Sequence, residues 1–123
     1  MESRAIYESD KTNIQKIEWL KLDDSEWKYL DAQPAEKNIK DIVKYLKDSK
    51  LYLVTNQNES KEIENAQLGN VLRNLHGQKD FKIWTRNFRY VVELNKVGIY
   101  RKGEKMPNGI EYFFAKVLKA LLR

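Results

Sequence analysis

The residues of this sequence best suited to chemistry are an acid and a lysine two positions apart, Asp80 and Lys82, which flank Phe81. Alternate residues of a β-strand project from the same face of a sheet, so these two charges would lie side by side on a strand. With a further acid such as Glu62 or Glu64, they could bind Mg²⁺ and stabilise cleavage of a phosphodiester bond. The alternative is structural: Asp80 ends a loop and Lys82 lies on a solvated face.

The triplet of residues 80–82 resembles the D/E-x-K strand of restriction-type nucleases, which implies a magnesium-dependent nuclease. The remaining acidic strand position of that motif is missing from this sequence. The single histidine, His76, precedes Gly77 at an expected helix end, where a cation can interact with the terminal carbonyls. The sequence contains no cysteine and no glycine-rich phosphate loop. We therefore assign no catalytic residue, metal ligand or cofactor, and the nuclease remains an open alternative.

The distribution of charge is uneven along the chain. The net charge is +5, but residues 1–76 carry 12 Lys/Arg against 14 Asp/Glu, whereas residues 77–123 carry 11 against 4. Such asymmetry favours nucleic acid or another acidic partner. The structural alternative is a lysine-rich surface that keeps the protein soluble.

Basic and aromatic residues alternate in the second half of the chain, as expected for a surface that tracks a phosphate backbone. Strand alternation places Trp84 with Lys82, opposite Phe81, so Trp84 is predicted to be partly exposed. Tyr90 is predicted to face the core. Nucleic-acid binding predicts that Lys82, Arg86, Arg89 and Arg101 form one contiguous positive surface. The candidate nucleic-acid-binding residues are Arg73, Lys79, Lys82, Trp84, Arg86, Arg89, Arg101 and Lys102.

Residues 60–94 resemble the recognition helix and wing of a winged-helix domain. The resemblance implies DNA binding, with the helix in the major groove and wing arginines on phosphates. Carried over, the helix contacts would be Gln67, Asn70, Arg73 and Asn74, and the wing contacts Lys82, Arg86 and Arg89. A polar loop, residues 56–62, stands where the preceding helix of that motif belongs.

A protein-binding inhibitor, immunity protein or adaptor is the alternative to nucleic-acid binding. Such proteins act through mixed charged and aromatic patches. Trp19 and Trp27, eight positions apart in an acidic region, could provide one, or they could belong to the core. A homodimer formed through the broad apolar face of residues 110–122 is a further possibility.

The chain is expected to form one α+β domain, residues 1–123, with residues 1–12 a candidate flexible segment. The predicted order is α-α-β-α-β-β-β-α, with a small four-stranded mixed or antiparallel sheet and helices mainly on one face. The predicted helices are residues 13–30, 34–47, 63–76 and 110–122. The predicted strands are residues 51–55, 81–84, 88–94 and 97–101.

A folded protein is expected because 41% of residues are hydrophobic and 11% are aromatic. The N-terminal residues lack the apolar core of a signal peptide, and no run approaches about 18 apolar residues. With no cysteine available for disulfides, these features favour a cytoplasmic protein without membrane segments.

Overall fold

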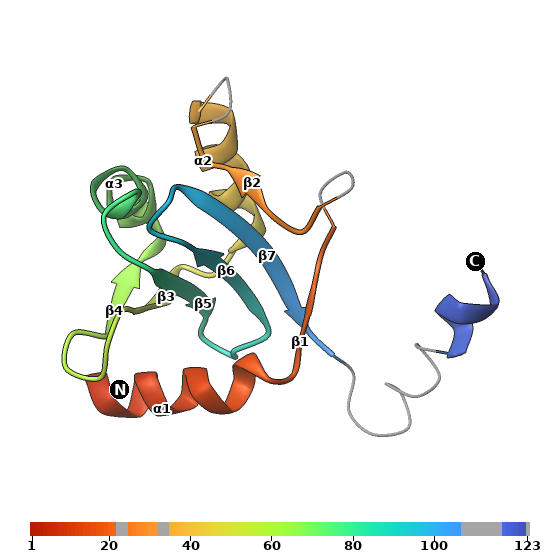
Figure 1. The fold of residues 1–123 in the computed structure, drawn as a ribbon. Coiled ribbons are helices and arrows are strands. Elements are labelled where there is room, and N and C mark those ends of the chain that lie inside the picture. The colour runs from red at the N-terminus through yellow and green to blue at the C-terminus, as the bar shows by residue number, and fades with distance from the viewer. Residues whose placement is uncertain (22–24, 32–34, 107–116, 123) are drawn as a thin grey trace.

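The computed structural model describes residues 1–21, 25–31, 35–106 and 117–122. They build an antiparallel sheet of seven strands in the order β1-β7-β6-β5-β3-β4, and β2 also pairs with β7 (Figure 1). The elements are α1 (Ser3–Ile14), β1 (Ile17–Trp19), β2 (Lys28–Tyr29), α2 (Ala35–Tyr45), β3 (Lys50–Val54), β4 (Lys61–Glu64), the 3-10 turn η1 (Asn65–Gln67), α3 (Leu68–Leu75), β5 (Phe81–Thr85), β6 (Tyr90–Leu94) and β7 (Ile99–Lys105).

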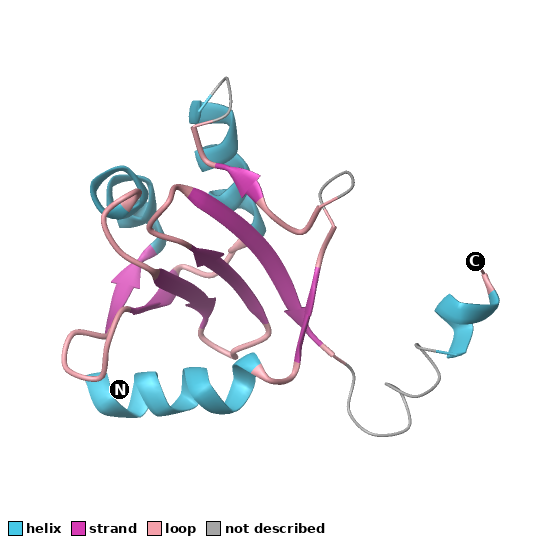
Figure 2. Ribbon diagram, in the orientation of Figure 1, coloured by secondary structure: helices cyan, strands magenta, loops and turns pink. Residues whose placement is uncertain are grey.

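Helices cover both faces of the sheet: α1 lies on one side, and α2 and α3 lie on the other (Figure 2). Because strand side chains alternate, each face has its own apolar layer. The layer under α2 and α3 includes Leu53, Ile83 and Val92. The layer between α1 and the sheet consists mainly of Ile6, Ile17, Tyr52, Val54, Trp84, Phe88 and Val91. Two of these three helices share a face, and α1 covers the face that the prediction of helices mainly on one side left open.

The α+β class and the central elements are confirmed. The apolar spacing of Ile39, Ile42 and Leu46 predicted α2, and these residues are buried. The alternation along residues 81–101 predicted the β5-β6-β7 meander, which pairs as expected. Short connections between these strands explain why local sequence was sufficient here.

The sheet is larger than expected and has no parallel pairing. A strand, a helix and a second strand suggested a parallel crossover, but β4 follows β3 first and reverses the chain. Strand β5 then returns antiparallel on the other side of β3. The Lys-Glu-Ile-Glu run of β4 buries only Ile63, so its strand signal is weak.

The N-terminal region differs most from the prediction. Residues 3–14, expected in part as a flexible segment, form α1, in which Ile6 is buried. The helix predicted for residues 13–30 is replaced by β1 and β2, which pair with β7 along its outer edge. The spacing of Ile14 and Ile17 suits a helix, but pairing with β7 satisfies the backbone and buries Ile17.

The predicted C-terminal helix, residues 110–122, is only partly described by the structure. Residues 117–121 are helical, and Leu118, Leu121 and Leu122 are exposed. The rest of the predicted C-terminal helix, residues 110–116, lies outside the described residues, as do Pro34 and Pro107. Among the helices that are described, none has the length and apolar character needed to cross a membrane.

Gly103 allows β1 to approach β7 closely. It lies opposite Trp19 in the pairing register, and a Cβ atom built on it would meet the Trp19 ring at 2.9 Å and also the Ile17 side chain.

We expect Gly103→Ala to destabilise the fold by about 1–3 kcal/mol, because β1 must move away from β7. Urea denaturation measures this. Gly69→Ala is the control, since its Cβ meets only the flexible Arg73 side chain in a helix. Equal stability of the two variants would contradict the prediction.

One buried and one partly buried tyrosine, Tyr100 and Tyr45, make stability sensitive to alkaline pH. Burial, with a smaller contribution from Asp41, raises the pKa of Tyr100 to about 12. Burial and then Glu104 raise the pKa of Tyr45 further above its ordinary value. These phenols ionise near pH 10 in the unfolded chain, so their stabilisation is complete below pH 10 and is lost as pH rises through 12.

The urea midpoint is therefore expected to fall steeply above pH 10. In a Tyr45→Phe/Tyr100→Phe variant the fall should be shallower, because only the lysines and the other tyrosines still titrate. The measurement is urea denaturation at pH 8, 10 and 11.5. Parallel pH profiles for the two proteins would show that these tyrosines do not cause the loss.

Candidate functional site

A row of charged side chains crosses the α1 face of the sheet. Lys82 of β5 lies opposite Glu93 of β6, which lies opposite Arg101 of β7. Directly opposed residues of antiparallel strands share a face, so these three side chains are neighbours. The parallel row through Tyr52 and Trp84 is apolar and lies beneath α1. The charged row thus marks where α1 stops covering the sheet.

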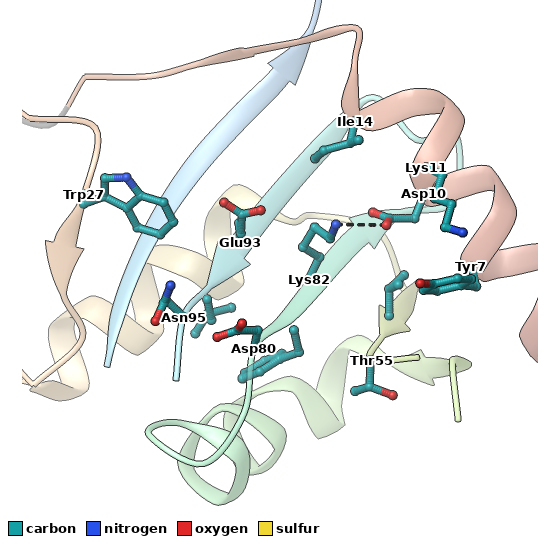
Figure 3. A pocket seen from close by; sticks show the side chains of 13 residues that line it. Tyr7, Asp10, Lys11, Ile14, Trp27, Thr55, Asp80, Lys82, Glu93 and Asn95 are labelled. Atoms are coloured by element: carbon teal, nitrogen blue, oxygen red, sulfur yellow. Dashed lines mark ion pairs between the residues drawn. The ribbon is translucent and has the colours of Figure 1, made fainter. Parts of the chain in front are cut away.

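The charged row borders a groove of about 420 Å³. We call it the α1 groove. Figure 3 shows α1 along one side, the ends of β5 and β6 in the floor, and Trp27 opposite α1. Its lining residues are Tyr7, Asp10, Lys11, Ile14, Trp27, Val54, Thr55, Asp80, Phe81, Lys82, Glu93, Leu94 and Asn95.

Asp10 fastens the helix wall of the groove to its floor. Its side chain is 4% exposed and accepts a hydrogen bond from the Trp84 indole Nε1 at 2.7 Å. The other carboxylate oxygen lies 2.9 Å from Lys82 Nζ (Figure 3). A buried carboxylate is tolerated when its oxygens are hydrogen-bonded and paired with a cation, as here. Nothing in the local sequence of α1 distinguishes Asp10 from a surface acid, so sequence reasoning missed it.

Arg101 lies between two tryptophans and two glutamates. Its Nε donates to Glu93 at 2.8 Å and its Nη1 to Glu26 at 3.0 Å. Its Cζ lies 3.7 Å from the centre of the Trp19 ring and 4.6 Å from that of Trp27. A planar guanidinium can stack on rings with its faces while its edge donates to carboxylates. We call Trp19, Arg101 and Trp27 the tryptophan–arginine stack.

The stack resolves the two interpretations of Trp19 and Trp27. Both rings are half-buried, so they are neither fully core nor fully surface. Their spacing in the sequence suggested a patch, but the arginine between them comes from β7. The cross-strand pair Glu93–Arg101 was the signal that could have identified the stack.

Each of the seven basic candidates is paired with a carboxylate, which weakens the argument that Lys82, Arg86, Arg89 and Arg101 form a positive surface for nucleic acid. Lys82 and Arg101 contribute to the α1 face, whereas Lys102 reaches Asp41 of α2 on the opposite side of the sheet. The other pairs are Arg73–Glu36, Lys79–Glu59, Arg86–Glu62 and Arg89–Glu104, with separations of 2.8, 3.8, 3.6 and 3.4 Å. Carboxylates therefore offset charge across all of these positions.

Trp84 is the clearest correction among the candidate residues. Strand alternation placed it correctly on the face of Lys82, but that part of the face is covered by α1. The ring is fully buried and packs on Phe88 at a centroid separation of 5.3 Å. The prediction of partial exposure is wrong because it assumed that this face was open to solvent.

The arrangement implied by the winged-helix resemblance is absent from the described residues. Helix α3 buries Leu68 and Leu72 on the α2 side of the sheet. Lys82 projects from the other face, and the β5–β6 hairpin lies inside the sheet rather than at its edge. Arg73 is held by Glu36 of α2. The helix and the hairpin therefore present no common surface for DNA.

Of the geometry that a nuclease needs, the described residues have only the proximity of Asp80 and Lys82 to one groove. Asp80 and Lys82 both line the α1 groove, but Lys82 binds Asp10, and Asp80 Oδ1 accepts the backbone N–H of Lys96 at 2.7 Å. In the described part of the chain no group of three His, Cys, Asp or Glu side chains could hold a metal ion. His76 lies 2.9 Å from Asp31, outside the groove.

We predict that Asp10→Ala destabilises the fold by about 2–4 kcal/mol, because the Trp84 indole N–H and the Lys82 ammonium lose their partner. Urea denaturation measures the change. Glu8→Ala, on the exposed side of the same helix, should cost less than about 0.5 kcal/mol. Asp10→Asn keeps an acceptor and should fall between them. Asp10→Ala as stable as Glu8→Ala would refute the anchoring role.

Comparison with known proteins gives no relative from which to transfer a function. Neither the protein-family models nor the curated proteins nor the solved structures include a match to this chain. The function must therefore be inferred from the contacts, burial and charges of the α1 groove and of the surfaces around it.

Proposed function

We propose that this chain is a non-enzymatic binding protein that recognises a partner protein through the α1 groove. The observation that carries the proposal is the tryptophan–arginine stack at the groove's edge. Trp, Tyr and Arg are the residues that most often dominate binding energy at protein interfaces. In the stack, Trp19, Arg101 and Trp27 are half-buried and are held in place before any partner arrives, which lowers the entropy lost on binding.

Electrostatics indicates the chemistry of that partner. Lys82 in the floor is engaged by Asp10, and Arg101 in the neighbouring strand by Glu93 and Glu26. Lys11 on the helix wall is exposed, and its ammonium lies over the Tyr7 ring. Asp80 is exposed and has no ion-pair partner among the described residues, and the Glu26 side chain is 40% exposed. A partner segment carrying lysine or arginine would complement these carboxylates.

Nucleic-acid binding by the basic strands remains a prediction with weaker support. Its phosphate contacts require arginines and lysines that can release counterions. The ion pairs at Arg86, Arg89 and Arg101 would have to be broken or shared first. The nuclease alternative would additionally need Asp80 and a second acid to converge on one ion, which the described geometry does not provide.

Site-specific crosslinking tests the proposal. A photoreactive benzophenone amino acid replaces Lys11, an exposed residue lining the groove, or Glu8, which is exposed on the same helix but does not line it. Crosslinking is carried out in the source cells, and products are identified by mass spectrometry. We expect one protein to be captured from position 11 and not from position 8.

The captured protein is then purified and titrated by calorimetry. Trp27→Ala and Asp80→Lys should each weaken its binding at least tenfold, whereas Glu8→Lys, with the same charge change as Asp80→Lys, should alter it less than twofold. All variants are first checked for an unchanged urea midpoint. If the groove variants bind like wild type, or if position 8 captures the same protein equally well, the α1 groove is not the interface.

A further inference from the structure

Four lysines lie on the side of the sheet opposite α1, around a hollow of about 570 Å³ between α2 and β2. They are Lys28, Lys37, Lys40 and Lys44, which we call the lysine face. Figure 1 shows β2 beside α2 at this end of the molecule, away from α1. The lysine face and the α1 groove are therefore separate surfaces that two partners could occupy at once.

The spacing of the helix lysines makes the face continuous. Lys37, Lys40 and Lys44 stand at positions i, i+3 and i+7 of α2, which places them in one stripe. The opposite side of the helix buries Ile39 and Ile42 against the sheet. All four lysines of the face are exposed. The helical spacing by itself places these lysines, together with Asp41, on the polar side of the helix.

Two carboxylates, Glu36 and Asp41, also line the hollow, and both are engaged by cations from other elements. Arg73 of α3 donates two hydrogen bonds to Glu36, at 3.2 and 2.8 Å, and Lys102 of β7 lies 2.8 Å from Asp41. The hydrogen bond from Arg73 is also the main reason that the pKa of Glu36 is lowered. Within the part of the chain that the structure describes, none of the four lysines has an ion-pair partner. Lys40 still acts electrostatically on Glu36, but the two acids of the hollow are shared with Arg73 and Lys102, so positive charge is in excess there.

This pattern reverses the expectation from the sequence. The basic candidates of the strands are each paired, whereas the lysines without an ion pair lie on α2 and β2, within residues 1–76, whose net charge is negative. Arg73 and Lys102 contribute to the effect indirectly, because they hold the acids that would otherwise neutralise the lysine face. The site could not be found from charge counts along the chain.

We infer that the lysine face binds the phosphate backbone of double-stranded nucleic acid. Lys37 and Lys44 are separated by about 10 Å along the helix axis, a length over which a duplex presents about six phosphates. Lysine binds phosphate as a point charge and without base selection. No aromatic side chain is among the described residues that line the hollow, so base stacking, the main attraction of single strands, is missing.

Fluorescence anisotropy tests this inference with three labelled probes of one length: a 20-base-pair DNA duplex, the corresponding RNA duplex and a single strand. We expect micromolar binding of a duplex at 50 mM salt, weaker binding of the single strand, and a steep loss by 200 mM salt. The DNA and RNA arms identify which duplex is preferred. No duplex binding at 50 mM salt would overturn the inference.

Charge-neutral variants locate the contact. Lys37→Gln/Lys40→Gln/Lys44→Gln should weaken duplex binding at least tenfold and reduce the slope of log K against log salt by about 3. The matched control, Lys79→Gln/Arg86→Gln/Arg89→Gln, loses the same charge from the paired strand region and should stay within threefold of wild type. Both variants should retain the wild-type melting temperature, since all six side chains are exposed.

If the Lys79/Arg86/Arg89 variant loses duplex affinity and the Lys37/Lys40/Lys44 variant keeps it, nucleic-acid binding belongs to the strands and the lysine face is overturned. Polyglutamate that competes as well as duplex at equal charge would also overturn it, because the face would then select an acidic protein. Trp27→Ala, which disturbs the α1 groove, should leave duplex binding unchanged. Failure of the groove proposal and failure of this one are therefore observed separately.

Discussion

The contact on which the rest of the structure depends is the buried carboxylate of Asp10, which holds the Trp84 indole and the Lys82 ammonium. A carboxylate removed from water is stable only while both partners stay in place, so the contact fixes α1 relative to β5. The position of α1 in turn decides which part of the sheet is covered and which part becomes the groove. The same contact also turns Lys82 from a surface cation into part of the scaffold.

Pairing of this kind extends over much of the molecule and gives each sheet face a different electrostatic character. On the α1 face, Lys82 is held by Asp10 of α1 and Arg101 by Glu93 of β6, and Asp80 is left exposed without an ion pair among the described residues. On the α2 face, Arg73 and Lys102 engage the acids of the helix, and four lysines make no ion pair among the described residues. Exposed pairs contribute little to stability individually. Their larger effect here is to determine which charges remain available to a partner.

The two proposed surfaces follow from this division. The α1 groove combines aromatic rings, an immobilised arginine and exposed carboxylates, a combination typical of protein recognition. The lysine face combines point charges without rings, a combination typical of contacts with phosphate. Because α1 and α2 cover opposite faces of one sheet, a protein bridging a basic protein partner and a nucleic acid would need no rearrangement of its fold.

The sequence by itself determined the elements whose pattern is local: α2 from the spacing of Ile39, Ile42 and Leu46, and the β5-β6-β7 meander from alternation and short turns. It also identified Asp80, Lys82 and the two tryptophans as chemically notable. Only the tertiary structure decided how charge is distributed, because the decisive pairs join positions far apart in the chain, Asp10 to Lys82 and Glu26 to Arg101. It likewise turned residues 17–19 into a strand and buried Trp84 beneath α1. The periodicity of a sequence shows which side of a helix or strand is apolar. Whether a charge on that element is paired, and whether its surface is covered, depends on which distant segment packs against it.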